Sequence, residues 1–264
     1  GFSTFTPQDF ADVIEAFGWE PFPYVGGNAV RNNVIGDLVF TANEAPPSRT
    51  IPFHHEMAQT RPCPSKVMFF CEVPAETGGE TPIVLSNQIY EELHARHPHF
   101  LRHLEDSGVR YCRVMTQHDR PDSAIGRGWQ STFKVQTKEE LETALRLEGA
   151  DWEWLPGGTL RHISPALPAV ELHPATGSKM FFNQIEAAYT GWRDEINHIG
   201  KAVTDSHGNP LDKDAMEDIV KISKEKCVAF KWEVGDILVI NNDTVLHSRS
   251  TFLGTRRILA SLAK

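Results

Sequence analysis

Several features that would assign this chain to a common class are scarce or missing. Only four cysteines occur in 264 residues, and no two of them have C-x-x-C spacing, so neither a disulfide framework nor a cysteine-based metal site is indicated. No apolar stretch reaches the length of a membrane-spanning helix. The 26 Lys and Arg residues are outnumbered by 35 Asp and Glu, which gives a net charge of −9. This charge argues against nucleic acid or an anionic membrane as a partner.

Repeats and low-complexity linkers are also missing, and the length predicts a single domain over residues 1–264. The chain begins at Gly1 rather than at methionine. We therefore expect that an N-terminal piece is missing, and with it any targeting segment. Scattered free cysteines suit a reducing compartment, so we predict a cytoplasmic protein. The sequence predicts no oligomeric state.

The order of predicted elements indicates a mainly β fold with flanking helices. Short β-type stretches include residues 38–41, 66–73, 81–85, 237–240 and 245–247. Helices are predicted to start near Thr6-Pro7, Ser86, Phe100, Thr137 and Asp212, from capping residues and apolar spacing. Many short strands and few helices are typical of a closed or sandwiched β core.

Two histidines and one carboxylate form the most informative pattern. His54 and Glu56 lie in one short motif and His247 lies near the C-terminus; two imidazoles and a carboxylate are the facial triad of non-heme Fe(II) oxygenases. Chance alone predicts about 1.6 copies of His-x-(Asp/Glu), and the chain has two. The other copy, His103 with Glu105, lies in a predicted helix, where residues i and i+2 point in different directions. On a strand they share a face, so we expect His54 and Glu56 to converge on one ion.

A zinc-protease motif is excluded. His55-Glu56 starts the pattern H-E-x-x-H, but position 59 is glutamine, so the second zinc ligand is missing. His55 should face away from the ion, since adjacent strand residues point to opposite sides.

Several segments together resemble the taurine dioxygenase/TfdA family of Fe(II)- and 2-oxoglutarate-dependent oxygenases, and most closely the clavaminate-synthase-like proteins of plants. The matching segments are residues 53–58, 78–84, 126–133, 187–192, 245–249 and 256–262. The resemblance spans essentially the whole chain. It implies a double-stranded β-helix, or jelly roll, with flanking helices. Family members usually carry a further strand-helix region before the point where this chain begins.

The resemblance also implies a ligand set. His54, Glu56 and His247 are expected to bind Fe(II), and Thr81 and Arg257 to hold the distal carboxylate of 2-oxoglutarate. A guanidinium grips a carboxylate through two charge-assisted hydrogen bonds, which suits that role. Because neighbouring strand residues face opposite ways, Arg256 is expected to be a solvated surface charge.

The substrate is less well defined. In taurine dioxygenase an arginine four positions after the 2-oxoglutarate arginine binds the sulfonate; here that position is Ser261, which argues against a taurine-like substrate. Trp129 and Asn183 are candidates for lining a substrate pocket, with ordinary core packing as the alternative. Asn43, together with Glu44, is a further candidate. Arg31 and Lys66 are alternatively surface charges or partners of an acidic substrate group.

The sequence thus predicts an oxygenase that uses Fe(II), 2-oxoglutarate and O2 to hydroxylate or desaturate a small polar metabolite, such as an amino acid or small acid, with release of succinate and CO2. Two alternatives stay open. One is a cupin-type iron oxygenase that needs no 2-oxoglutarate. The other is a catalytically silent metal- or metabolite-binding protein on the same scaffold.

Overall fold

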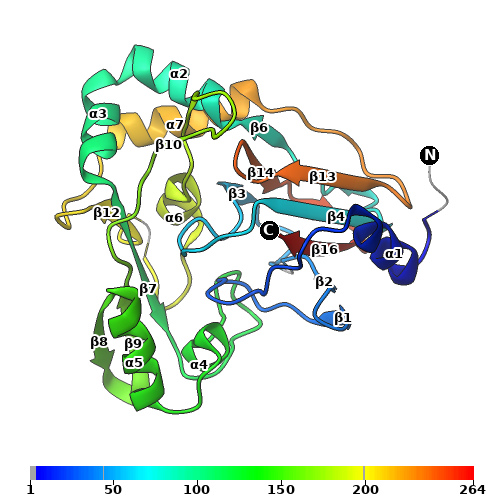
Figure 1. The fold of residues 1–264 in the computed structure, drawn as a ribbon, viewed down its shortest axis with the longest axis horizontal. Helices are drawn as coiled ribbons and strands as arrows, with labels where there is room; N and C mark the ends of the chain where they lie inside the picture. The colour runs from blue at the N-terminus through cyan, green and yellow to red at the C-terminus, as the bar shows by residue number, and fades with distance from the viewer. Residues whose placement is uncertain (1–3, 44, 199) are drawn as a thin grey trace.

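The computed structural model describes residues 4–43, 45–198 and 200–264. Its strands form one large sheet and several smaller ones, all antiparallel (Figure 1). The five-stranded sheet has the order β1 (Asn33–Ile35), β2 (Val39–Thr41), β16 (Arg257–Ala263), β4 (Lys66–Val73) and β13 (Ile237–Asn241). The three-stranded sheet has the order β3 (Ile51–His54), β14 (Val245–Arg249) and β6 (Ile83–Leu85).

The remaining strands lie outside these two sheets. A four-stranded sheet has the order β12 (Val203–Asp205), β7 (Val109–Met115), β9 (Thr159–Ile163) and β8 (Asp151–Leu155). Two short pairs join β10 (Glu171–Leu172) to β11 (Lys179–Met180) and β15 (Phe252–Leu253) to β5 (Thr77–Gly78). The predicted mainly β jelly roll is confirmed by this architecture and by the structural relatives reported below.

The five predicted helices begin within two residues of the positions that the sequence signals indicated. They are α1 (Pro7–Phe17), α2 (Ser86–Arg96), α3 (Pro98–Ser107), α4 (Trp129–Phe133), α5 (Lys138–Glu148), α6 (Ile185–Gly191) and α7 (Lys213–Lys226), with a short 3-10 turn at Pro156–Gly158. Thr6 and Thr137 each close a capping box at the start of α1 and α5. The α4 and α6 helices were not predicted, because five and seven residues are too few to show a helical period.

Strand β4 explains how the large sheet is buried on both faces. Val67 and Phe69 pack into the cluster between the two sheets, while Met68 and Phe70 pack with Phe10 of α1 on the outer face. Alternate residues of a strand point to opposite faces. A continuous apolar run is therefore required here, rather than the polar alternation of a half-exposed strand.

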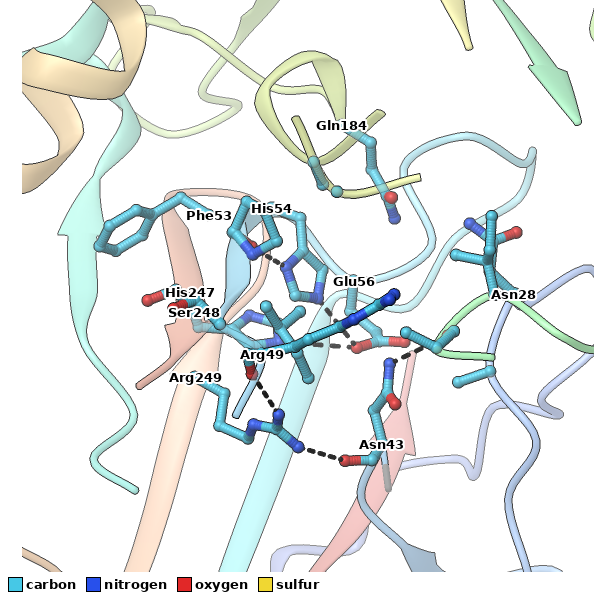
Figure 2. Close-up of a pocket in the computed structure, with 18 of the residues that line it drawn as sticks. Asn28, Asn43, Arg49, Phe53, His54, Glu56, Gln184, His247, Ser248 and Arg249 are labelled. Atoms are coloured by element: carbon cyan, nitrogen blue, oxygen red, sulfur yellow. Dashed lines mark hydrogen bonds and ion pairs between the residues drawn. The ribbon is translucent and has the colours of Figure 1, made fainter. Parts of the chain in front are cut away.

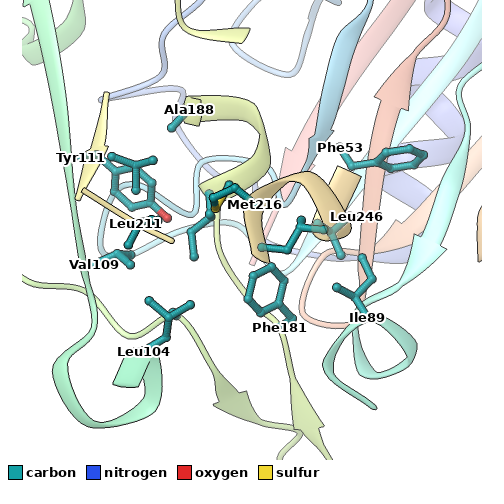
Figure 3. Packing of buried hydrophobic residues seen from close by; sticks show 14 of the residues in the cluster. Phe53, Ile89, Leu104, Val109, Tyr111, Phe181, Ala188, Leu211, Met216 and Leu246 are labelled. Atoms are coloured by element: carbon teal, nitrogen blue, oxygen red, sulfur yellow. The ribbon is translucent and has the colours of Figure 1, made fainter. Parts of the chain in front are cut away.

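The three-stranded sheet has a similar division that positions the site. Phe53 of β3 and Leu246 of β14 point to a cluster with Ile89 of α2 and Met216 of α7 (Figure 3). Their neighbours His54 and His247 consequently face the other way, toward the large sheet, where the His247 ring lies 5.2 Å from the ring of Phe69. The helix cluster thus fixes which side of both strands is available for chemistry.

Candidate active site

His54, Glu56 and His247 meet at one point. His54 and His247 are directly paired across β3 and β14, and their ring centroids are 4.3 Å apart. Glu56 Oε2 lies 3.9 Å from His54 Nε2 and 3.6 Å from His247 Nε2. One ligand atom from each residue lies within 4.8 Å of the other two. Two nitrogens and one oxygen this close together suit a single Fe(II) ion.

Glu56 reaches this point by a different route from the one expected. Strand β3 ends at His54, and Glu56 belongs to a turn, so a shared strand face is not what aligns the two side chains. Met57 takes a left-handed conformation with φ 57°, which costs a non-glycine residue about 1 kcal/mol. The turn as a whole places the Glu56 carboxylate beside the two histidines.

Asn242, a fully buried residue, clamps this turn. Its Oδ1 accepts a hydrogen bond from Glu56 N at 2.7 Å, and its Nδ2 donates to Glu56 O at 3.0 Å and to Pro64 O at 2.7 Å. His55 faces away from the triad, as predicted, and its Nδ1 bonds to the Asn242 carbonyl. Sequence reasoning missed Asn242, because a lone Asn in a turn motif carries no signal of its distant partner.

The protonation states of the triad suit metal binding. Burial lowers the pKa of His54 to about 4, with His247 adding to the effect, so His54 is neutral near pH 7. Its Nδ1 bonds to Pro52 O at 2.8 Å, which places the proton on Nδ1 and leaves the Nε2 lone pair for a metal. Burial is the largest influence on Glu56 and opposes its ionisation, but the charge of Arg31, a hydrogen bond from His247 and the nearby histidines together outweigh it and hold the pKa of Glu56 well below its usual range.

Arg31 is an unexpected member of the site. Its Nη2 donates to Glu56 Oε1 at 2.8 Å, and both side chains are 7% exposed. Burial is the largest influence and disfavours the charged form of Arg31, but interactions with Glu56 and Tyr24 together outweigh it, so the pKa of Arg31 is raised. Of the two predictions left open for Arg31, the surface charge is wrong. Lys66, in contrast, lies over the Trp19 ring and outside the cavity described next.

The triad opens into a cavity of about 610 Å³. Figure 2 shows His54, Glu56 and His247 beside Arg49, Arg249 and Asn43, with Gln184 across the cavity. Arg249 donates to the carbonyls of Ala45 at 2.7 Å and Pro46 at 2.9 Å, and also to that of Arg49. A buried arginine of the strand that carries His247 thus holds the loop beside the cavity in place.

The prediction that Arg257 faces the site is wrong. Arg257 has a 44% exposed side chain and forms an ion pair with Glu72, and it does not line the cavity, whereas Arg256 and Ile258 do. The side chains of the two arginines do face opposite ways, as expected for a strand, but Arg256 is the one that faces the cavity. Arg256 Nε donates to Gly79 O at 2.9 Å, and burial lowers the pKa of Arg256 to about 10.

Thr81 and Gly79 complete this end of the cavity. Thr81 is 4% exposed and lines the cavity, as expected, and its Oγ1 accepts a hydrogen bond from Trp232 Nε1 at 3.1 Å. Gly79 has φ +75°, and a Cβ there would lie 3.0 Å from Arg256 Cδ. Position 79 therefore requires glycine both for its backbone and for its contact with the arginine.

Of the three substrate candidates, two are placed elsewhere. Trp129 packs in the cluster around Leu141 and Leu145 and donates from Nε1 to Gly158 O. Asn183 is buried and donates to Ala169 O. Neither lines the cavity, so both follow the core-packing alternative.

Asn43 does line the cavity and donates to Ala124 O at 3.4 Å (Figure 2); Glu44 lies outside the described residues. The prediction missed Arg49, Gln184 and Glu186, which also line it. The segment 187–192 had been matched to the family, but nothing in its spacing assigned α6 to the cavity wall.

A double-stranded β-helix with a His-Glu-His triad at the mouth of its sandwich defines an Fe(II)- and 2-oxoglutarate-dependent oxygenase. The chain belongs to the taurine catabolism dioxygenase TauD, TfdA family, whose pattern matches residues 1–262. It is 48% identical over 264 residues to a clavaminate synthase-like protein of Arabidopsis thaliana. The match covers 100% of this chain and 80% of that protein. This membership favours 2-oxoglutarate chemistry over the cupin alternative.

Solved structures agree on the fold. A putative α-ketoglutarate-dependent taurine dioxygenase from Burkholderia xenovorans matches with a TM-score of 0.54 and 16% identity, over 99% of this chain and 74% of that one. An asparagine oxygenase with Fe(II), hydroxyasparagine and succinate matches with a TM-score of 0.51 and 12% identity, over 94% and 70%. No helix among the described residues has the length and apolar character needed to cross a membrane.

Proposed function

We propose that His54, Glu56 and His247 hold Fe(II), that Thr81 and Arg256 hold the distal carboxylate of 2-oxoglutarate, and that the enzyme hydroxylates or desaturates a small polar metabolite. The observation that carries the proposal is the placement of Arg256. It lines the same cavity as the triad, while its neighbour Arg257 is paired with Glu72 outside. A dicarboxylate cosubstrate requires a guanidinium next to the metal triad, and among the described residues no carboxylate forms an ion pair with Arg256.

The contacts of Arg256 and Thr81 leave suitable donors free. The bond from Arg256 Nε to Gly79 O orients the guanidinium, and no ion pair among the described residues includes Arg256. Trp232 donates to Thr81 Oγ1, so the Thr81 hydroxyl is left to donate its own hydrogen. Two N–H groups of the Arg256 guanidinium and the O–H of Thr81 can then bind a carboxylate.

The triad supports the same conclusion. When bound, Fe(II) supplies the activation of O2 that oxidises a C–H bond of the substrate, and three protein ligands leave positions open for cosubstrate and oxygen. His54 offers a lone pair fixed by Pro52, and Glu56 offers a carboxylate fixed by Asn242. The residues therefore keep their ligand atoms aimed at one point before any ion binds.

The size and lining of the cavity favour a small polar substrate. About 610 Å³ lies in the usual range for small-molecule sites, and charged groups line it from several elements. A structural relative is an asparagine oxygenase, which is consistent with an amino acid or small acid. Position 261 is a buried serine, and the position four after Arg256 is Ala260, so neither offers a cation for a sulfonate.

The test compares Arg256→Gln with the matched variant Arg257→Gln. We expect the first to weaken 2-oxoglutarate binding by about 10- to 100-fold, since it removes charge-assisted hydrogen bonds, and the second to leave it unchanged. A metabolite library is then screened for stimulated release of succinate from 2-oxoglutarate. Equal effects of both substitutions would reject the cosubstrate assignment. Absence of any succinate, even uncoupled from substrate, would favour the catalytically silent alternative.

The single domain over residues 1–264 and the cytoplasmic location stay predictions.

A further inference from the structure

The exposed side chains among those that line the cavity indicate where it opens to solvent. Most of the lining is buried or half-buried. Its exposed residues are Ser48, Arg49 and Thr50 before β3, Arg193 after α6, and Lys224 near the end of α7. Pro52 of β3 and Gly191 of α6 lie in contact, since a Cβ on Gly191 would meet Pro52 Cδ at 2.8 Å. The entrance therefore lies where the segment 48–50, the end of α6 and the end of α7 come together.

Positive charge is concentrated at this entrance. Arg49, Arg193 and Lys224 are cations, and no ion pair among the described residues includes any of them. The next lysine along α7, Lys226, is in contrast paired with Glu92. The charges of the three entrance residues are thus left uncompensated in a protein whose net charge is −9.

No carboxylate of the described cavity wall offsets this charge at the surface. The two that line the cavity are Glu56 of the triad and Glu186 of α6. Both are buried, with exposed fractions of 5% and 4%, and Glu186 accepts a hydrogen bond from Ser223 at 2.7 Å. A cleft whose exposed charges have one sign attracts ligands of the opposite sign and raises their rate of association.

The range of this attraction is short enough to be local. Salt screens charges over a Debye length of about 8 Å at physiological ionic strength and about 30 Å at 10 mM salt. An anion that reaches the entrance is consequently attracted by the nearby cations more than it is repelled by acidic groups elsewhere on the surface. The attraction is greatest for a dianion, and 2-oxoglutarate carries two ionised carboxylates at neutral pH.

We propose that Arg49, Arg193 and Lys224 steer 2-oxoglutarate into the cavity, so that they raise its association rate without holding it once it is bound. This inference rests on the proposed function, since 2-oxoglutarate is the ligand that enters. The three entrance cations act on capture, whereas Arg256, which binds the distal carboxylate in the proposed function, acts on release. Charges at the rim of a site typically change kon, and groups that contact the bound ligand change koff.

The test measures both rates by rapid mixing. Protein loaded with Mn(II) is mixed with 2-oxoglutarate, and tryptophan fluorescence is followed, because Trp232 donates a hydrogen bond to Thr81 in the cavity wall. In the double variant Arg193→Gln/Lys224→Gln we expect kon to fall by about 5- to 10-fold at about 10 mM salt and about twofold at about 150 mM, for cations about 10 Å from the entering dianion. The koff of this variant should equal that of the wild type, and Arg256→Gln should instead raise koff.

Arg102→Gln/Lys134→Gln is the matched control. Both residues are exposed, neither belongs to an ion pair among the described residues, and neither lines the cavity. The control removes the same amount of charge from other parts of the surface, so its kon should stay close to that of the wild type. Equal kon values in the two double variants, or a change in koff rather than in kon for Arg193→Gln/Lys224→Gln, would overturn the inference.

The salt dependence of the wild type gives an independent answer. If the entrance cations dominate, kon falls as salt is added, because their attraction is screened. If the net charge of −9 dominated, screening would remove repulsion and kon would rise. A kon that rises with salt or does not respond to it would therefore contradict steering.

The two proposals fail in different ways. Equilibrium dialysis of the Mn(II)-loaded wild type shows whether 2-oxoglutarate binds at all, independently of fluorescence. Absence of binding would reject the proposed function, and the role of the entrance with it. Binding at a rate that is insensitive to salt and to the loss of Arg193 and Lys224 would reject the role of the entrance alone.

Discussion

Replacing Asn242 with alanine tests whether the Glu56 turn is held in place from outside the triad. The substitution removes three hydrogen bonds, one from Glu56 N and two to the carbonyls of Glu56 and Pro64. All three partner groups lie against a side chain that is 0% exposed. Each buried group left unpaired costs about 1–3 kcal/mol, and water entering the new space recovers part of this. We therefore expect a loss of about 3 kcal/mol in the free energy of unfolding.

The effect on metal binding should exceed what lost stability explains. Met57 has φ 57°, so the turn is strained and relaxes when its clamp is removed. The Glu56 carboxylate then leaves the point shared with His54 and His247. Loss of a residue that orients a metal ligand typically weakens metal binding by about 10- to 100-fold, and we expect that range for Asn242→Ala.

Asn197→Ala is the matched control for this experiment. Asn197 is 6% exposed and also forms three hydrogen bonds, from Val114 N at 2.8 Å, to Val114 O at 3.0 Å and to Asp194 Oδ1 at 3.0 Å. It lies outside the cavity lining. Urea unfolding gives the stability of both variants, and Mn(II) titration gives the metal affinity. If both variants lose stability and keep the wild-type metal affinity, the positioning role of Asn242 is refuted.

Three further substitutions test other parts of the account. His54→Ala should weaken Mn(II) binding by more than about 100-fold, whereas His103→Ala, in the other His-x-Glu motif and paired with Asp205, should not; equal affinities would remove His54 from the site. Arg249→Ala should lower the free energy of unfolding by about 3 kcal/mol and raise the proteolysis rate of loop 45–49, whose carbonyls it binds; an unchanged rate would contradict the loop assignment. Burial raises the pKa of Glu186 from 4.5 to about 7, so the folded state holds this proton more tightly than the unfolded chain and stability falls as the pH rises through that window, by up to about 3 kcal/mol. Glu186→Gln should remove this loss in urea unfolding at pH 5 and 8, unlike Glu217→Gln on the surface, and a pH dependence that is the same in both variants would reject it.

Local signals accounted for much of the fold. The capping residue and proline at Thr6-Pro7 and the capping-box pattern at Thr137 predicted where α1 and α5 begin, because the hydrogen bonds involved join residues three positions apart. The run at 66–73 predicted β4 from its composition. In contrast, the pairing of His54 with His247 depends on strand order, which no local pattern encodes. Family resemblance supplied that information.

The site was predicted less completely than the fold, for identifiable reasons. The choice between Arg256 and Arg257 depends on which residue of a strand faces inward, and a shift of one position reverses the answer. The β16 register has an irregularity between Arg257 and Ile258, so extrapolating the alternation along the chain was unsafe. Asn242 was given no role, and Arg31 was considered only as a surface charge or a partner of a substrate acid, because each acts through Glu56 and that contact exists only in three dimensions.

The central claim is that this cavity binds Fe(II) and 2-oxoglutarate together. The most direct measurement is the visible absorption spectrum of the protein mixed with Fe(II) and 2-oxoglutarate under anaerobic conditions. We expect a weak charge-transfer band that appears with the wild type and is lost in His54→Ala. A wild type without the band, or a band that persists in His54→Ala, would contradict it.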